Sequence, residues 1–148
     1  MNREIKFRGK DIQSNKWVYG NLIIDNKGNC KIVEFDNDGN NFEFNVNSDT
    51  VGQFSGFKDK NDKEMYEGDV FALPANGSIK DFEAFGWEPL YPRYVRLVAV
   101  AYGLDGFGFC SPCHAKLKNP DISAMSAHDR MYNIGNIYDN PELMEEKL

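Results

Sequence analysis

Hydrophobic and polar residues alternate along the first part of the chain with the period of two that half-buried β-strands show. Residues 4–8, 17–24, 30–35 and 42–46 carry this alternation, and short clusters of Asp, Asn, Lys and Gly separate them. Turn signals that recur about every ten residues are typical of antiparallel barrels and sandwiches. The sequence therefore predicts a series of β-hairpins in this region.

The central segment, residues 50–71, predicts a strand, a charged loop and a second strand. Gly68 and Asp69 stand directly before the second apolar stretch. Glycine adopts a backbone conformation that other residues resist, and an Asp side chain accepts hydrogen bonds from nearby backbone N–H groups. We therefore expect a tight turn at these two residues.

The C-terminal half adds strands and a short helix to this pattern. Residues 94–102 are almost continuously apolar, which predicts a central strand covered on both faces, and residues 107–110 and 131–138 predict two more strands. Asn140, Pro141 and Glu142 supply a cap, a first helical residue and an acidic first turn. The predicted fold is mainly β: a small antiparallel barrel, SH3-like or open, with additional strands and a short C-terminal helix. We expect one domain over residues 1–148, or a β subdomain over residues 1–49 followed by the barrel and helix over residues 50–148.

Composition and charge restrict the cellular compartments and the classes of binding partner that the sequence predicts. The net charge of −6 and the pI of about 4.9 argue against a broad electrostatic attraction to phosphate backbones or anionic lipid. Residues 2–16 are polar and charged, unlike a signal peptide, and the longest apolar run, residues 97–102, is far shorter than the ~20 residues that span a bilayer. We expect a soluble protein of the cytoplasm without membrane contact.

Cys110, Cys113 and His114 form the sharpest candidate for a metal or redox site. A C-x-x-C pair presents two thiolates to one metal ion or forms a disulfide, and the histidine adds a nitrogen. Structural zinc needs about four ligands, and only Cys30 and His128 are further candidates. The redox motif belongs at a helix N-terminus in a βαβ unit, whereas here it ends a strand. Incidental cysteines are the preferred interpretation, with metal binding and redox chemistry as alternatives and no cofactor expected.

No motif predicts catalysis. The segment around Gly39 lacks the Glu at position twelve of a calcium loop, the glycines of residues 103–108 are wrongly spaced for dinucleotide binding, and P-loop, nucleophile-elbow and zinc-protease motifs are absent from the sequence. His128 and Asp129 are adjacent, but sequence neighbours do not usually face each other. We do not expect an enzyme.

Two aromatic segments are candidates for binding. The first, within residues 74–92, carries Phe82, Phe85, Trp87 and Tyr91, and either packs as a long loop against the body or contacts a partner protein. The second would stack nucleic-acid bases through Phe54, Phe57 and Tyr66 beside Lys58 and Lys60. Acidic residues 59, 62 and 64 neutralise that loop, so the preferred interpretation makes its aromatic residues core and makes nucleic-acid binding the alternative.

Four segments resemble the YopX family of bacteriophage and prophage proteins. They are REIKFRGKD at residues 3–11, KWVYGNLI at 16–23, TVGQFSGFKDKNDKEMYEGDV at 50–70 and NIGNIYDNPELMEE at 133–146. The resemblance implies a mostly β protein of small-barrel type, encoded by a phage or integrated element and acting in the bacterial cytoplasm. It implies no catalytic residues. We therefore expect a non-enzymatic accessory protein that binds protein, either a second copy of itself or a host or phage protein.

Overall fold

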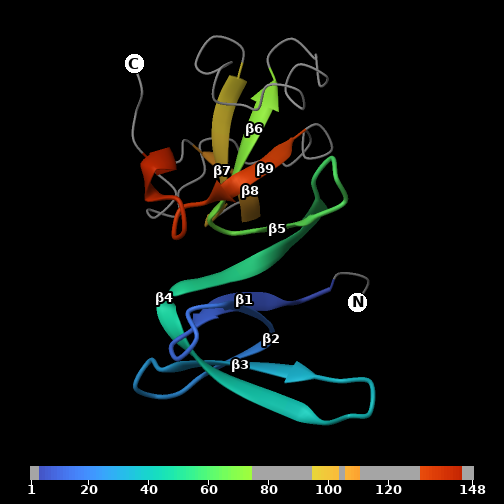
Figure 1. Cartoon of the computed structure of the whole chain (residues 1–148), viewed down its shortest axis with the longest axis vertical. Coiled ribbons are helices and arrows are strands. Elements are labelled where there is room, and N and C mark those ends of the chain that lie inside the picture. The colour runs from blue at the N-terminus through green and yellow to red at the C-terminus, as the bar shows by residue number, and fades with distance from the viewer. Residues whose placement is uncertain (1–3, 75–94, 104–105, 111–130, 145–148) are drawn as a thin grey trace. The chain divides into compact units, whose positions relative to one another are not determined.

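The structure is a computed structural model that describes residues 4–74, 95–103, 106–110 and 131–144 (Figure 1). Its strands pair antiparallel, and a short 3-10 helix lies near the C-terminal end, so the predicted mainly β fold is confirmed. Backbone contacts divide the chain into two compact units, Met1–Gly56 and Phe57–Leu148, called here the N-unit and the C-unit. The predicted domain count and the division at residues 49 and 50 stay predictions.

The N-unit is a set of consecutive antiparallel hairpins. Its strands are β1 (Phe7–Asp11), β2 (Trp17–Ile24), β3 (Cys30–Phe35) and most of β4 (Asn41–Lys58), and the short β5 (Glu64–Tyr66) follows β4 in the strand order of the sheet. Each strand pairs with the next, and β1 pairs additionally with β4, so the pairings of the first four strands form a closed cycle. The prediction of an SH3-like or open barrel stays a prediction.

Strand β4 is longer than the sequence pattern indicates. Residues 42–46 and 50–57 predict two separate segments, but one strand runs through the polar residues between them. It pairs with β3 through Asn41–Val46 and with β1 further on. The pairing with β1 shifts register between Arg8 and Lys10, and there the Thr50 hydroxyl accepts a 2.9 Å hydrogen bond from the Lys10 N–H and donates one of 2.7 Å to the Asn47 carbonyl. The buried Thr50 hydroxyl thus makes the hydrogen bonds that regular strand pairing does not provide at this register shift.

Three hairpin loops of the described chain share one arrangement, in which an Asp side chain closes the loop from its first position. Asp25 Oδ1 accepts the N–H groups of Lys27 and Asn29 at 2.8 and 2.9 Å, and the loops that begin at Asp36 and Asp59 repeat these bonds. Hydrogen bonds from the backbone and side chain of Asn29 lower the pKa of Asp25, and the pKa of Asp36 is lowered in the same way, chiefly by the Asn40 side chain. These loops form because the Asp carboxylate satisfies backbone donors that the turn leaves without a partner.

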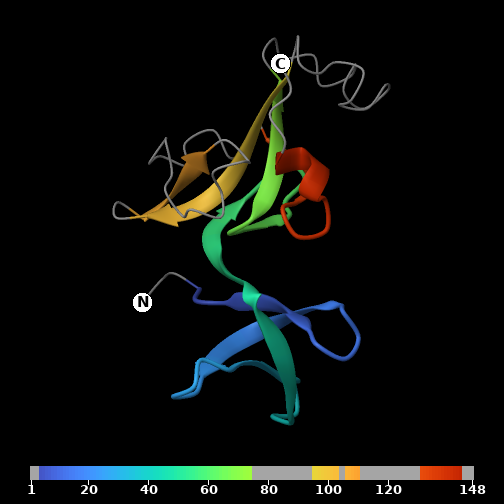
Figure 2. The same ribbon diagram turned by 90° about the vertical axis from the view of Figure 1, so that its left-hand side faces the viewer.

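The C-unit is built on a second antiparallel sheet with the strand order β8-β7-β6-β9. These strands are β6 (Asp69–Pro74), β7 (Val95–Gly103), β8 (Gly106–Cys110) and β9 (Tyr132–Asn136), and the predicted C-terminal helix is present as the 3-10 helix Pro141–Met144. Figure 2 shows β8, β7 and β6 of this sheet in orange, gold and green. The unit's core cluster joins Val70, Ala99, Ile137 and Leu143. Strand β9 ends at residue 136, earlier than predicted, because the chain turns there.

Two tight turns fix the C-unit, and both occur in segments that resemble the YopX family. Gly68 has φ of +87°, donates its N–H to the Val100 carbonyl at 3.0 Å and accepts the Ile137 N–H at 2.9 Å. The buried Asp69 carboxylate accepts the Tyr66 N–H at 2.9 Å. The predicted turn at Gly68 and Asp69 is therefore confirmed, including the role of the Asp side chain.

The second turn, residues 136–140, depends on one buried side chain. Asn136 Oδ1 accepts the N–H groups of Tyr138 and Asp139 at 2.9 and 2.8 Å, while its Nδ2 donates to Asp139 Oδ2 at 3.0 Å. The Asn136 N–H in turn donates to Asn140 Oδ1 at 3.2 Å. Residues 136–140 thus have a structural role, because their side chains provide hydrogen-bond partners for the backbone N–H groups of the turn.

Candidate protein-binding surface

Several residues proposed from the sequence lie outside the described part of the chain. They are the aromatic residues Phe82, Phe85, Trp87 and Tyr91 and the candidate ligands Cys113 and His114. Cys110 ends strand β8. The protein-binding and metal-binding predictions for these residues therefore stay predictions. Within the described residues, no group of three or more His, Cys, Asp or Glu side chains is arranged to hold a metal ion.

The only cysteine whose side chain is described, Cys30, takes part in the N-unit core. It is buried with Ile32 and Val46, and its thiol is oriented toward the Gly28 carbonyl at 3.6 Å. Cysteine often behaves as a small hydrophobic residue in this way. Cys30 therefore has a packing role that accounts for its presence without a ligand.

The residues proposed to stack nucleic-acid bases do not form an exposed aromatic platform. Phe54 and Tyr66 are only 4% and 2% exposed, which agrees with the interpretation that they belong to the core. Phe57 is 39% exposed, and Lys58 Nζ lies 3.7 Å from Asp62 Oδ1 within the charged loop. A buried ring offers no face to an incoming base, so the burial argues against this alternative.

A set of basic residues lies instead over aromatic rings in the N-unit. The Arg8 guanidinium carbon lies 4.4 Å from the centroid of the Trp17 ring, and Lys10 Nζ lies 5.5 Å from it. Lys6 Nζ lies 5.6 Å from the centroid of the Phe54 ring and 3.3 Å from Glu4. At these distances the rings attract the cations, so the positive charges of this face serve packing within the N-unit.

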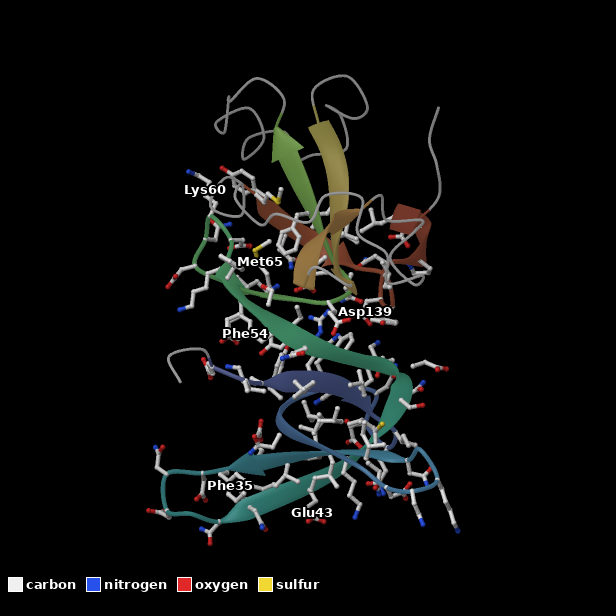
Figure 3. All side chains as sticks on the ribbon, turned by 180° about the vertical axis from the view of Figure 1, so that it is seen from behind. Phe35, Glu43, Phe54, Lys60, Met65 and Asp139 are labelled. Carbon is white, nitrogen blue, oxygen red and sulfur yellow. The ribbon has the colours of Figure 1, made fainter. Side chains whose placement is uncertain are left out.

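Large apolar side chains are exposed on the hairpins of the N-unit. Phe35 and Phe42 flank the β3–β4 loop and are 58% and 51% exposed, while Ile12 and Ile23 are 66% and 50% exposed. Figure 3 shows Phe35 at the end of its hairpin. These residues are not among the binding candidates that the sequence predicts, although residues 22–24 carry a usable signal. Successive residues of a strand face opposite ways, so three apolar residues in a row place at least one away from the core.

A groove of about 580 Å³ lies entirely within the N-unit, and the exposed Ile12 and Ile23 belong to its lining. Ile12 and Gln13 of the β1–β2 connection, Ile23 and Asp25 of β2 and its loop, and Glu43 of β4 are among its lining residues. Lys31 Nζ lies 3.5 Å from Glu43 Oε2 on the same face. The lining therefore combines apolar side chains with the carboxylates of Asp25 and Glu43, and its one lysine is already paired with Glu43.

These features define a class: a mainly β protein of paired hairpins that exposes an apolar, partly acidic surface on one unit. Residues 6–145 match the family model described as YopX protein. The chain belongs to the YopX family, as its four sequence segments indicate.

One comparison with solved structures extends the match to the fold. The crystal structure of protein EF1440 from Enterococcus faecalis is similar over 97% of this chain and 100% of that chain, with 21% sequence identity and a TM-score of 0.56. No curated protein matches the chain. Among the described residues, no helix has the length and apolar character needed to cross a membrane. The shared fold carries no activity from one protein to the other.

Proposed function

We propose that this protein is a non-enzymatic accessory protein of a bacteriophage or prophage that acts in the bacterial cytoplasm by binding protein. The protein is proposed to form a small antiparallel barrel with additional strands. The hairpins of its N-unit serve as the binding surface, and its partner is a second copy or a host or phage protein. Phe35 and Phe42 are exposed on the same hairpin that buries Ile32 and Val46, and this exposure is the observation that carries the proposal.

The physical argument is the cost of keeping these side chains in water. Each Å² of apolar surface removed from water contributes about 25 cal/mol, and aromatic side chains dominate the binding energy of protein interfaces. Single exposed apolar residues are common on protein surfaces, but here several lie on adjacent hairpins. A protein partner suits this surface better than a nucleic acid, because the chain is acidic and carboxylates line the adjacent groove.

The test compares the F35T/F42T double variant with the wild type in affinity capture from nuclease-treated host lysate and in light scattering of the purified protein. Threonine retains strand propensity, so the free energy of unfolding should change by less than about 1 kcal/mol. We expect the double variant to lose a discrete captured protein, or to lose self-association, by at least about tenfold, the effect of removing one interface hot spot.

I5T serves as the matched control, since Ile5 is also half exposed but lies outside the hairpins. A parallel F85A/W87A variant tests the surface predicted from the sequence alone. If F35T/F42T captures and self-associates like the wild type while F85A/W87A does not, protein binding stands but the N-unit surface is wrong. If neither double variant differs from the wild type, the proposed function is contradicted.

A further inference from the structure

One edge of strand β4 is paired over part of its length only. Asp36 donates its N–H to the Asn40 carbonyl, and antiparallel partners exchange hydrogen bonds at every second residue. Counting along the register from this pair, Phe42 and Phe44 direct their peptide groups toward β3. Asn41, Glu43 and Asn45 therefore direct theirs to the opposite edge.

The Asn45 carbonyl confirms this assignment, because it accepts the Ile12 N–H at 2.9 Å on that opposite edge. Ile12 follows directly after β1, whose pairing with β4 ends at Asp11 and Val46. The chain then turns back toward β2, with Asp11 accepting the Asn15 N–H at 2.8 Å. Within the described residues, no strand continues along β4 beyond this point, so the peptide groups of Asn41 and Glu43 have no strand partner on that edge.

The side chains along this edge of β4 point alternately to the two faces of the sheet. Residues directly opposite each other in a sheet share a face, so Ile12 and Asn45 point to the same side, and both line the groove. Glu43 is two residues from Asn45 and lies on this groove face as well. Phe42 and Phe44 point to the other face, where Phe44 packs against the N-unit core and Phe42 is half exposed.

We propose that the free edge of β4 at Asn41–Phe44 binds an extended peptide segment with the order apolar–basic–apolar, which adds to the sheet as an antiparallel strand. This proposal rests on the proposed protein-binding function and specifies the chemistry of the partner. The basic residue lies opposite Glu43, exchanges both backbone hydrogen bonds with it and places its side chain at the groove rim. Its aliphatic stem passes along Ile12, and its charge meets the Glu43 carboxylate.

The two flanking residues of the segment lie opposite Phe42 and Phe44. Their side chains point to the other face of the sheet, where an apolar residue covers the exposed ring of Phe42. Charge complementarity selects the central residue, because Glu43 and Asp25 line the groove and its lysine, Lys31, is paired with Glu43. Strand addition to an open edge is a common mode of peptide recognition, in which the backbone supplies affinity and alternate side chains supply specificity.

The test uses three labelled, end-blocked octapeptides with Ser and Thr flanks and the centres Val-Arg-Val, Val-Glu-Val and Val-(N-methyl-Arg)-Val. Binding to the full-length protein is measured by fluorescence anisotropy. We expect the Arg peptide to bind about fivefold or more tightly than the Glu peptide, since opposite and like charges directly across a strand pair differ by that order. N-methylation removes the donor to the Glu43 carbonyl and should weaken binding by about tenfold.

The E43K variant should reverse the preference, so that the Glu peptide binds more tightly than the Arg peptide, and its circular dichroism should match that of the wild type. Equal affinities of the three peptides for the wild type, or no saturable binding, would overturn strand addition. An unchanged preference in E43K would overturn the assigned register. If F35T/F42T abolishes capture from lysate while all three peptides fail to bind, the proposed function stands and only this inference is lost.

Discussion

The two units of the molecule use their residues differently. Of the six largest fully buried side chains among the described residues, all but Ile32 belong to the C-unit, and Met65, Val70 and Phe71 are among them. The N-unit has a small cluster around Cys30, Ile32 and Val46, and it exposes aromatic and aliphatic side chains on its hairpins. Among the described residues, the C-unit is therefore distinguished by close packing, and the apolar surface that the N-unit exposes is the one proposed to bind protein.

Two glycines show the same difference in packing between the units. Gly28 in the N-unit and Gly68 in the C-unit have nearly equal φ angles of +85° and +87°. A Cβ atom at Gly28 would meet nothing within 4 Å, whereas one at Gly68 would lie 2.8 Å from Tyr138 Cε2. Both positions require a left-handed backbone conformation, but only at Gly68 would a Cβ atom also clash with a neighbouring side chain.

The largest expected effect therefore separates these two glycines. G28A should reduce the free energy of unfolding by about 1 kcal/mol, the cost of a left-handed conformation for a residue with a Cβ. G68A carries the same cost and must also displace the Tyr138 ring, and we expect a loss of about 3 kcal/mol. Urea unfolding of the two variants measures both values. Equal losses would show that the packing around Gly68 does not restrict this position.

A second contrast concerns asparagine side chains that close turns. Asn136 in the C-unit is buried and makes three hydrogen bonds within its turn, whereas Asn40 in the N-unit is exposed and donates one to Asp36 at 3.1 Å. N136A leaves the part-buried N–H groups of Tyr138 and Asp139 without their acceptor, which should cost about 1–2 kcal/mol, whereas N40A lets water replace the partner and should cost about 0.5 kcal/mol or less.

Thermal and urea unfolding of N136A and N40A provide the comparison. N136D is a useful third variant, because it retains the acceptor for Tyr138 and Asp139 but replaces the donor to Asp139 with a like charge. Its stability should therefore rise as the pH falls toward the range in which carboxylates become protonated. If N136A is as stable as N40A, the turn at residues 136–140 is held by its backbone alone.

Much of this architecture could be predicted from the sequence, because local chemistry determines it. Alternation located the hairpins, and Gly68 with Asp69 marked a turn whose hydrogen bond the structure confirms. The length of β4 could not be predicted in this way. At the register shift within β4, the Thr50 hydroxyl accepts a hydrogen bond from Lys10, a residue 40 positions away in the sequence. Long-range pairing of this kind leaves no periodic signal.

The candidate binding surface was harder to predict from the sequence. Phe35 and Phe42 look like core residues in an alternating pattern, and only the ends of the strand pairings show that they pass beyond the N-unit core. Phe54 and Tyr66 illustrate the opposite case: the sequence favours core positions for them and leaves an exposed platform as the alternative, and both rings are buried. Composition identifies side chains that can bind, whereas exposure depends on which strands cover them.

The smallest expected effect comes from the exposed Asp loops of the N-unit. Hydrogen bonds from Asn29 and Asn40 lower the pKa values of Asp25 and Asp36 below the usual 3.8 in the folded state. A group with a lowered folded pKa stabilises the protein fully above its unfolded pKa, and this contribution is lost as the pH falls through the folded value. The D25N/D36N variant retains side-chain acceptors for the loop N–H groups but cannot titrate at these positions. Its stability should therefore fall less steeply than that of the wild type between about pH 4 and pH 2, as measured by urea unfolding across that range. Parallel profiles for the two proteins would show that the loops form equally well with protonated carboxyl groups, and that the hairpins of the N-unit depend on Gly28, Gly39 and strand pairing instead.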